Sequence, residues 1–296
     1  MKTFLIRLSA FALIALVGYV AAFALVIALH RRALGHCDLG KPVDSLIVGD
    51  SHGMWSIDDS GIEGLRNVSL NAEGYKYSYA KLKHVLQAAP GLKTLYVSFG
   101  YHNLAGYYDE YILGATFGAY IERYLSVLGR KDYEELFAFG PFDFPELTRK
   151  AVHRGLTPGL KGQCLLYGTF PAERMMEGFR AGSMEKRVID QFYVDGKVGG
   201  VSASNLEYLS KLVSLGRQRG LRVVLLSPPV HPEYEKRVPA KFKELLVDFI
   251  RKHELEHFGF EDLALGDAHF LPDGDHTNYA GAVAATARFK LYHESH

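Results

Sequence analysis

The stretch Leu46-Ile-Val-Gly-Asp-Ser-His-Gly53 decides how the rest of the chain is interpreted. Its apolar start predicts a short buried strand over Asp44–Gly49 that ends in a turn. A serine on a tight turn after a parallel strand exposes its hydroxyl at the carboxyl edge of the sheet, where open α/β sheets bind ligands. If a helix follows, its free N–H groups can stabilise negative charge that develops beside the serine. Ser51 is therefore a candidate nucleophile.

Strands and helices alternate on both sides of a long irregular stretch. Besides the first strand, the pattern predicts buried strands over 93–100 and 221–227, and helices over 75–88, 205–218, 241–257 and 281–292. This alternation predicts βαβ units and a parallel sheet that is covered on both faces. The stretch of about 104–204 is rich in Gly, Pro, Tyr and Phe and has broken helical patterns without strands. It predicts a helical insertion over the carboxyl edge of the sheet. The aromatic residues of this insertion would form its own core or, as the alternative, line a ligand groove.

A candidate base lies near the far end of the chain. Asp273 and His276 are three residues apart in the segment Phe270-Leu-Pro-Asp-Gly-Asp-His-Thr-Asn. One turn can aim both side chains at a single point, so that the carboxylate orients the imidazole and stabilises its protonated form. Serine is a weak nucleophile and needs such a base. The structural alternatives are that Ser51 only caps a helix and that Pro-Asp-Gly-Asp only forms a turn.

Together the two motifs resemble those of the SGNH/GDSL hydrolase superfamily. The resemblance consists of a GDS motif that ends at Ser51 after the first strand and a D-x-x-H motif that ends at His276 before the last helix. It covers about 44–103 and 205–292. It implies a flavodoxin-like three-layer α/β/α sandwich with a mostly parallel sheet. In such a site Ser51 is the nucleophile, His276 the general base and Asp273 its partner.

The resemblance also implies an oxyanion hole. In the family this hole uses the N–H of the nucleophile, here Ser51, a glycine after the second strand and an asparagine in a G-x-N-D segment. Gly74 is the candidate glycine, with Asn71 as an alternative. Asn103 is the candidate asparagine, although it lies one residue late and no aspartate follows it, so His102 is an alternative. Gly74 and Asn103 could equally be ordinary turn residues.

The amino-terminal segment is strongly apolar. Residues from Leu8 to Leu29 carry no charge, and at ~1.5 Å per residue this run is long enough for the ~30 Å hydrocarbon core of a bilayer. It predicts a membrane anchor and connector over 1–40, followed by an SGNH-like α/β domain over 41–296. A cleaved signal peptide is the alternative, because Ala22-Phe23-Ala24 has the small-x-small form of a cleavage site.

The side of the membrane on which the domain lies is less well defined by the sequence. The basic residues before and after the apolar run nearly balance, so the positive-inside rule gives no clear orientation. Cys37 and Cys164 could form one disulfide in an oxidising compartment, although two unpaired thiols fit the sequence as well. We expect a single-pass protein whose carboxyl-terminal domain is extracytoplasmic, in the periplasm or at the cell surface.

Charge and metal-ligand patterns limit the other classes. The 34 Lys+Arg balance 33 Asp+Glu, without the basic excess of a nucleic-acid-binding protein, and two cysteines exclude a four-cysteine zinc site. His253-Glu-Leu-Glu-His257 matches H-E-x-x-H, which on a helix binds zinc and uses the first Glu as a base. Lys252 and Glu256 are charged where zinc peptidases prefer uncharged residues, and the apolar spacing favours an ordinary amphipathic helix. No metal and no cofactor is predicted.

The sequence thus predicts a membrane-anchored serine esterase or O-acyltransferase that acts on an acyl ester or a cell-envelope polysaccharide. The resemblance to single-anchor SGNH-like proteins of lipoteichoic acid D-alanylation and alginate acetylation implies a multipass membrane acyltransferase as partner, beside the lipid bilayer. The main alternative is a non-catalytic SGNH-like protein that binds glycan or scaffolds an envelope complex. A zinc peptidase is a further alternative, which rests on the HELEH segment alone.

Overall fold

The computed structural model describes residues 1–40, 42–111 and 120–296, which form two compact units. One unit contains residues 1–38 and the described part of 113–166, and the other contains residues 39–112 and 167–296. Lys41 and residues 112–119 of the predicted insertion lie outside the described residues. The division into an anchor over 1–40 and a domain over 41–296 remains a prediction.

A five-stranded parallel sheet forms the centre of the second unit, in the order β2-β1-β3-β6-β7. Its strands are β1 (Ser45–Val48), β2 (Leu65–Asn67), β3 (Thr94–Ser98), β6 (Arg222–Leu226) and β7 (Glu256–Phe258). In register, Leu46 of β1 lies opposite Leu95 of β3. The chain reverses its direction across the sheet at β1 and β3, which is the flavodoxin-like switch point. The predicted α/β fold class is confirmed.

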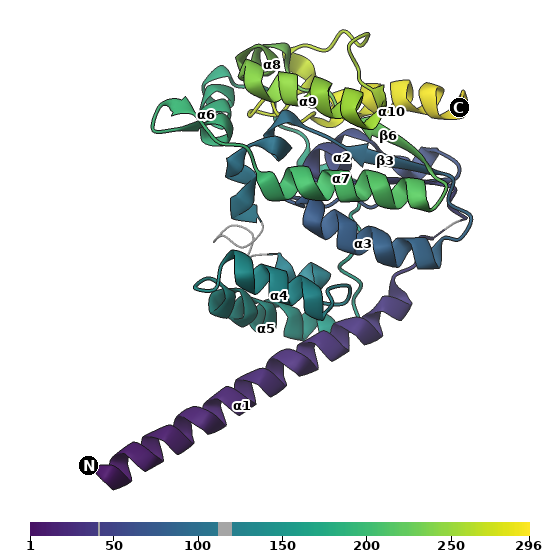
Figure 1. Cartoon of the computed structure of the whole chain (residues 1–296). Helices are drawn as coiled ribbons and strands as arrows, with labels where there is room; N and C mark the ends of the chain where they lie inside the picture. The colour runs from purple at the N-terminus through teal and green to yellow at the C-terminus, as the bar shows by residue number, and fades with distance from the viewer. Residues whose placement is uncertain (41, 112–119) are drawn as a thin grey trace. The chain divides into compact units, whose positions relative to one another are not determined.

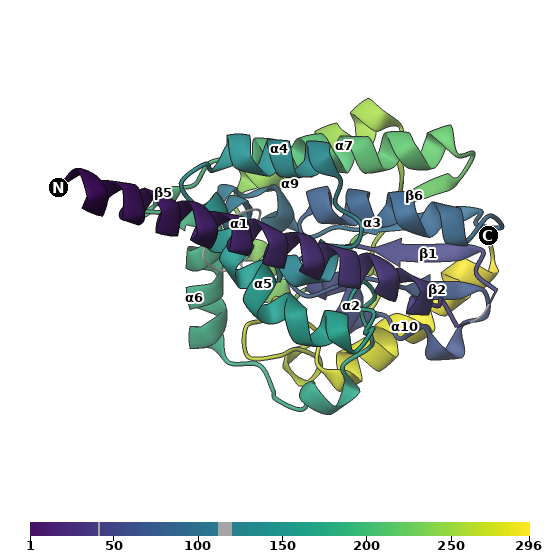
Figure 2. The ribbon, with the colours of Figure 1, turned by 90° about the horizontal axis from the view of Figure 1, so that it is seen from below.

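Helices cover both faces of this sheet (Figure 2). They are α2 (Ser51–Ser56), α3 (Tyr75–Ala88), α6 (Ala181–Phe192), α7 (Ala203–Gln218), α8 (Pro232–Arg237), α9 (Ala240–His253) and α10 (Tyr279–Glu294). Alternate strand residues point to opposite faces. Leu46 and Val48 join a core with α3, α7 and α9, whereas Ile47 joins a second core with Phe289 of α10. The sheet is therefore buried on both sides, which explains why β1 is an unbroken apolar run.

Short 3₁₀ helices connect several of these elements. They span Leu34–His36, Asp59–Gly61, Tyr101–Leu104, Gly106–Tyr111, Ile121–Tyr124, Ala172–Arg174 and Asp267–His269.

Several boundaries differ from the predictions. The helix expected over 241–257 ends at His253, because Glu254 takes a left-handed conformation with φ of 46° and Glu256–Phe258 then form β7. The insertion was expected to lack strands, but it contains an antiparallel hairpin of β4 (Tyr193–Val194) and β5 (Lys197–Val198). The hairpin turns at Asp195-Gly196, where both φ values are positive, as Asp-Gly turns favour.

The first unit contains α1 (Lys2–Ala33), α4 (Arg130–Phe139) and α5 (Phe144–Leu160). Helices α1 and α5 lie side by side (Figures 1 and 2). Gly155 permits this approach, because a Cβ at that position would lie 2.8 Å from Val26 Cγ1. The Nε2 atom of His30 is 2.8 Å from the carbonyl oxygen of Gly155.

The helix within Lys2–His36 is long and apolar enough to cross a membrane, the one such helix among the residues that the structure describes. Beyond it, Cys37 and Cys164 form a disulfide, with their Cα atoms 5.2 Å apart. Of the two states that the sequence allowed for these cysteines, the structure contains the bonded one.

Candidate active site

The turn between β1 and α2 carries Ser51. Gly49 has a φ of 144°, which suits glycine, and a Cβ there would lie 2.6 Å from Cβ of Ser98 on β3. Asp50 is the N-cap of α2, and its Oδ1 accepts a hydrogen bond of 3.0 Å from the backbone N–H of His52. Gly49 therefore allows the turn and Asp50 caps the helix. Together they place the half-buried Ser51 at the carboxyl edge of the sheet.

Ser51, His276 and Asp273 are brought together by the structure. The Oγ atom of Ser51 lies 2.8 Å from Nε2 of His276, and Nδ1 of His276 lies 2.7 Å from Oδ2 of Asp273. An ionised carboxylate can only accept, so His276 donates through Nδ1 and its Nε2 is free to accept from the serine hydroxyl. Oδ1 of Asp273 accepts from the N–H groups of Asp275 and His276 at 3.1 Å each, which fixes the carboxylate.

The charge state of Asp273 suits this arrangement. Burial alone would raise the pKa of Asp273, but the attraction and hydrogen bond of His276 outweigh it and hold the pKa below its ordinary value. The other side of the imidazole is covered by Trp55, whose ring centroid lies 5.1 Å from that of His276. His276 is therefore held on two sides and is largely shielded from water.

Asn103 and Gly74, the two residues predicted to join Ser51 in an oxyanion hole, contact other parts of the protein in this structure. Asn103 donates through Nδ2 to Oδ2 of Asp50 at 2.8 Å, and its Oδ1 accepts from the N–H of Gly100 at 2.7 Å. Gly74 is the N-cap of α3, where a Cβ would lie 3.4 Å from Oδ1 of Asn205. It remains a prediction that an oxyanion hole is formed by Ser51 N–H, Gly74 and Asn103.

The alternative Asn71 is connected to the triad by contacts. Its Oδ1 accepts a hydrogen bond of 2.6 Å from Nε1 of Trp55, the residue that packs on His276. The next residue, Ala72, has a φ of 58°, a conformation that favours glycine.

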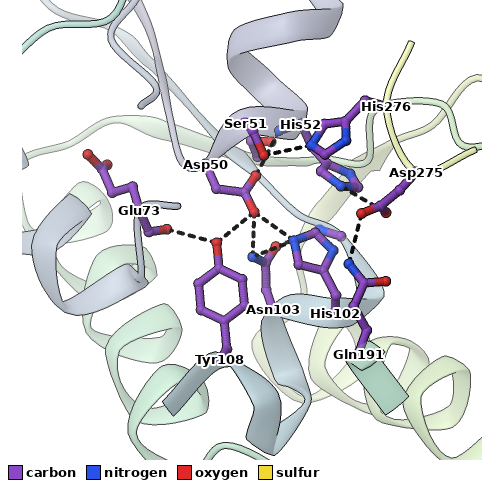
Figure 3. Close-up of polar contacts among 12 residues, drawn as sticks. Asp50, Ser51, His52, Glu73, His102, Asn103, Tyr108, Gln191, Asp275 and His276 are labelled. Carbon is purple, nitrogen blue, oxygen red and sulfur yellow. Dashed lines mark hydrogen bonds and ion pairs between the residues drawn. The ribbon is translucent and has the colours of Figure 1, made fainter. Parts of the chain in front are cut away.

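A buried hydrogen-bond network surrounds the carboxylate of Asp50 (Figure 3). Its Oδ2 accepts from His102 Nε2 at 2.7 Å, from Asn103 Nδ2 at 2.8 Å and from the hydroxyl of Tyr108 at 2.8 Å. Burial alone would raise the pKa of Asp50, but the contacts with His102, His52 and Asn103 hold it well below its ordinary value. The residue before the nucleophile is therefore a buried carboxylate with four donors, including the backbone N–H of His52.

Asp275 forms a second buried carboxylate site on the turn that carries His276. Its Oδ2 accepts from Arg187 Nε and Gln191 Nε2 of α6 at 2.8 Å each. Its Oδ1 lies 3.0 Å from Nε2 of His52 (Figure 3). Burial alone would lower the pKa of His52, but Asp275 outweighs it and raises the pKa. Sequence reasoning missed this residue, because nothing in Pro-Asp-Gly-Asp-His shows which aspartate has partners from the insertion.

His52, Asp275 and His276 are a group whose donor atoms converge as metal ligands do. These atoms lie within 4.8 Å of one another. Zinc–nitrogen bonds are about 2.0–2.1 Å, so ligand atoms on one ion lie at most about 4.2 Å apart. Both nitrogens of His276 also contact Ser51 and Asp273. As they are arranged, these residues do not fit a zinc ion.

The HELEH segment does not form the expected zinc motif. His253 is the last residue of α9, whereas His257 lies on β7 and its Nε2 is 2.9 Å from Oγ of Ser227. The left-handed residue Glu254 separates the two histidines, so they do not share a helix face. The zinc-peptidase alternative is therefore wrong in its structural premise, a shared helix face for the two histidines.

We expect His253→Ala to leave the zinc content of the purified protein unchanged in elemental analysis, and a loss of stoichiometric zinc would contradict this.

A cavity of about 180 Å³ opens at the carboxyl ends of β3, β6 and β7. Its lining includes His52, Gly100, Tyr101, Pro228, Glu235 and Glu261. The cavity thus adjoins the residue that follows Ser51, on the sheet edge where ligands bind in open α/β folds.

Comparisons with known proteins give a limited result. No family model and no curated protein matches this chain. A structure from Bacteroides fragilis NCTC 9343, described as an acylhydrolase, is similar over 91% of this chain and 97% of its own, with 9% identity and a TM-score of 0.44. A structure from Streptococcus pneumonia, described as a platelet activating factor, covers 96% of this chain and 98% of its own, with 14% identity and a TM-score of 0.42.

A psychrotrophic esterase from Pseudoalteromonas covers 84% of this chain and 95% of its own, with 10% identity and a TM-score of 0.36. The five-stranded parallel sheet with helices on both faces is the α/β fold class that the sequence predicts.

Proposed function

We propose that this protein is a serine esterase or O-acyltransferase in which Ser51, His276 and Asp273 act as a catalytic triad. The observation that carries the proposal is the continuous hydrogen-bonded series from Ser51 Oγ through His276 to Asp273, with distances of 2.8 and 2.7 Å. Both distances lie within the range that proton transfer requires. The tautomer that Asp273 imposes leaves Nε2 of His276 available as the base.

The reaction would proceed in two steps. As Ser51 Oγ attacks the acyl carbon, its proton passes to Nε2 of His276, and Asp273 stabilises the imidazolium that forms. His276 then gives this proton to the leaving alcohol, which departs and leaves an acyl group on Ser51. In the second step His276 removes a proton from water or from an acceptor hydroxyl, whose oxygen takes the acyl group. The bond from the acyl carbon to Ser51 Oγ breaks, and His276 returns the proton to Ser51 Oγ. Hydrolysis and transfer therefore use the same residues and differ only in the acceptor.

We propose that the acceptor or substrate belongs to the cell envelope, with α1 as a membrane anchor and a multipass acyltransferase as partner. Two observations support the location. The first part of α1 is exposed on all sides and apolar, as Phe11 and Ile14 illustrate. The Cys37–Cys164 disulfide is typical of a protein outside the cytoplasm. The polysaccharide substrate and the acyltransferase partner rest on the sequence resemblance alone.

The disulfide leads to a test of the location. We expect the protein from cell membranes, alkylated before lysis, to yield one linked peptide pair with Cys37 and Cys164 under non-reducing conditions. Recovery of both cysteines as alkylated free thiols would contradict the extracytoplasmic placement.

The disulfide also leads to a prediction about stability. The bond closes a loop with a sequence separation of 127, so its loss through Cys164→Ser should lower the free energy of unfolding by about 2–5 kcal/mol.

Turnover of a short ester tests the proposed activity. We expect the purified full chain to hydrolyse p-nitrophenyl acetate, and Ser51→Ala to reduce this rate to the background of the buffer. Ser60→Ala is the matched control, since Ser60 is an exposed serine outside the site, and it should retain the full rate. A folded wild-type protein whose rate equals that of Ser51→Ala would exclude the enzyme and favour a binding protein.

One observation favours the second candidate, a non-catalytic SGNH-like glycan-binding or scaffold protein. The amide of Asn103, which the resemblance assigns to the oxyanion hole, donates to the carboxylate of Asp50 instead. Loss of a single oxyanion donor costs an enzyme about 10²–10³-fold in kcat. A binding protein would bind envelope polysaccharide equally well with and without Ser51→Ala, and neither form would turn over an ester.

A further inference from the structure

An apolar groove lies between α1 and α4 in the unit formed by residues 1–38 and the described part of 113–166. Its volume is about 910 Å³. Phe23, Ala24 and Ile27 of α1 form one wall, and Phe137 of α4 with Phe144 of α5 forms the other. This volume lies within the range of small-molecule binding sites, and the lining is mostly apolar, as in such sites.

The groove has a polar end. Arg31 and Arg130 both line it, and Arg31 Nη2 donates to the carbonyl oxygen of Leu128 at 3.3 Å, which ties α1 to the start of α4. Arg130 also pairs at 2.7 Å with Glu134, an exposed residue that lines the groove too, so the lining has two positive charges and one negative charge. Two arginines at one end of an apolar groove provide the charge and the donors that a phosphate group requires.

Tyr133 supplies a third polar group between the two ends. Its ring packs against Phe23, with centroids 5.8 Å apart. Its hydroxyl is buried and has no hydrogen-bond partner among the residues that the structure describes. Burial raises the pKa of Tyr133, so the hydroxyl remains a neutral donor. A buried donor without a partner is costly, and an acceptor in the groove would remove this cost.

The groove is continuous with the surface of α1 that a bilayer would contact. The helix is exposed and apolar before Tyr19, whose hydroxyl is hydrogen-bonded to Thr148 of α5. The exposed Glu146–Arg149 ion pair lies on the same turn of α5 as Thr148. Along α1, Phe23 lies nearer than Arg31 to this exposed apolar part of the helix.

Exposed aromatic residues extend the same surface. Phe137, Phe139 and Phe142 are 52%, 50% and 96% exposed. The first two lie at the end of α4, and Phe142 lies in the segment that joins α4 to α5. Large exposed aromatic groups beside a membrane-facing helix are typical of segments that rest in the headgroup region. A segment in this region lies among lipid headgroups, so lipid molecules are next to the adjoining groove.

We propose that this groove binds one anionic phospholipid of the bilayer. Arg31 and Arg130 bind the phosphate, the hydroxyl of Tyr133 donates to an ester carbonyl, and an acyl chain lies between α1 and α4. A basic pocket beside a membrane helix is the expected site for an anionic headgroup. An apolar transmembrane helix of another protein has no counter-charge for the two arginines, so a lipid fits the lining better. This site is independent of Ser51 and of the proposed ester chemistry.

Fluorescence quenching by brominated lipids tests the proposal. Trp55 is the only tryptophan, so the full chain with Trp55→Phe and Phe137→Trp reports from the groove alone. In vesicles of phosphatidylcholine and phosphatidylglycerol, we expect stronger quenching when the bromine is on the phosphatidylglycerol chains than when it is on the phosphatidylcholine chains. The control combines Trp55→Phe with Ile189→Trp, a half-exposed position in the other unit, and should show no difference between the two lipids.

Matched variants separate a specific site from general contact with the bilayer. In the Phe137→Trp background, Arg130→Gln should reduce the preference for phosphatidylglycerol about fivefold, which corresponds to the ~1 kcal/mol of one arginine near an anionic surface. Lys131→Gln removes a neighbouring exposed charge that does not line the groove and should change the preference less.

Three results would overturn the proposal. Equal quenching by the two brominated lipids, unchanged by Arg130→Gln, would mean that the segment only touches the bilayer. An equal effect of Lys131→Gln would mean that the net charge, and not the groove, selects the lipid. Absence of quenching together with photocrosslinking from position 137 to a membrane protein would assign the groove to a protein partner.

Discussion

The full chain with His276→Ala should lose about 10⁴–10⁶-fold in kcat/KM for ester hydrolysis, and Ser51→Ala should lose as much. The reason is that Ser51 Oγ and His276 Nε2 are 2.8 Å apart and act as one unit, so either substitution removes the activated nucleophile. The double variant should therefore be no slower than either single variant, because the effects of such residues are not additive. Initial rates at several ester concentrations give kcat/KM for the wild type, the two single variants and the double variant.

Asp273→Asn should cost about 10⁴-fold in kcat with a smaller effect on KM. An asparagine can fill the same space, but its amide can donate to Nδ1 of His276 and so favours the tautomer that cannot accept from Ser51. The matched control is Asp262→Asn, which alters an exposed aspartate that pairs with Arg288 away from the triad. Rates of Asp273→Asn within tenfold of wild type would remove Asp273 from the triad.

Asp50→Ala should destabilise the fold by about 3–5 kcal/mol, the second large effect that we expect. The substitution leaves the donors of His102, Asn103 and Tyr108 buried without their common acceptor. The fluorescence of Trp55 during urea unfolding, measured in detergent at neutral pH, reports the change. Asp248→Ala, at an exposed carboxylate paired with Arg251, is the control and should change the free energy of unfolding by less than ~1 kcal/mol.

The same carboxylate gives the wild-type protein an acid dependence. Because the pKa of Asp50 is lower in the folded state than its ordinary value of about 3.9, its stabilising effect is present above that value and is lost as the pH falls below it. The stability gap between wild type and Asp50→Ala should therefore narrow between neutral pH and about pH 3. A gap that is the same at both pH values would show that Asp50 is not a charged acceptor in the folded protein.

The parts of the fold that were predicted correctly have strong local signals. The apolar strand before Gly49 and the helix over Tyr75–Ala88 follow from hydrophobic pattern and from the Pro and Gly that end the helix. The edge strands β2 and β7 were missed, because each has three residues and lacks a distinct apolar run. The end of α9 was misplaced, because the left-handed turn at Glu254 is not marked by a glycine.

The residues of the candidate site also fall into those that a local sequence pattern indicates and those that it does not. Ser51, Asp273 and His276 could be named from the sequence, because a serine after a strand and an Asp-x-x-His turn carry their chemistry in short spacings. Asp50 and Asp275 could not, because their partners come from segments distant in sequence, such as Tyr108 and α6. Buried polar networks of this kind depend on tertiary structure and have no local pattern.

The most direct measurement is the site at which a fluorophosphonate attaches to the folded, full-length protein. A triad predicts one stoichiometric adduct on the peptide that contains Ser51, found by mass spectrometry of the digest. It also predicts no adduct with His276→Ala, although Ser51 is still present in that variant. Absence of an adduct in the folded wild-type protein, or an adduct on a different serine, would contradict the proposed active site.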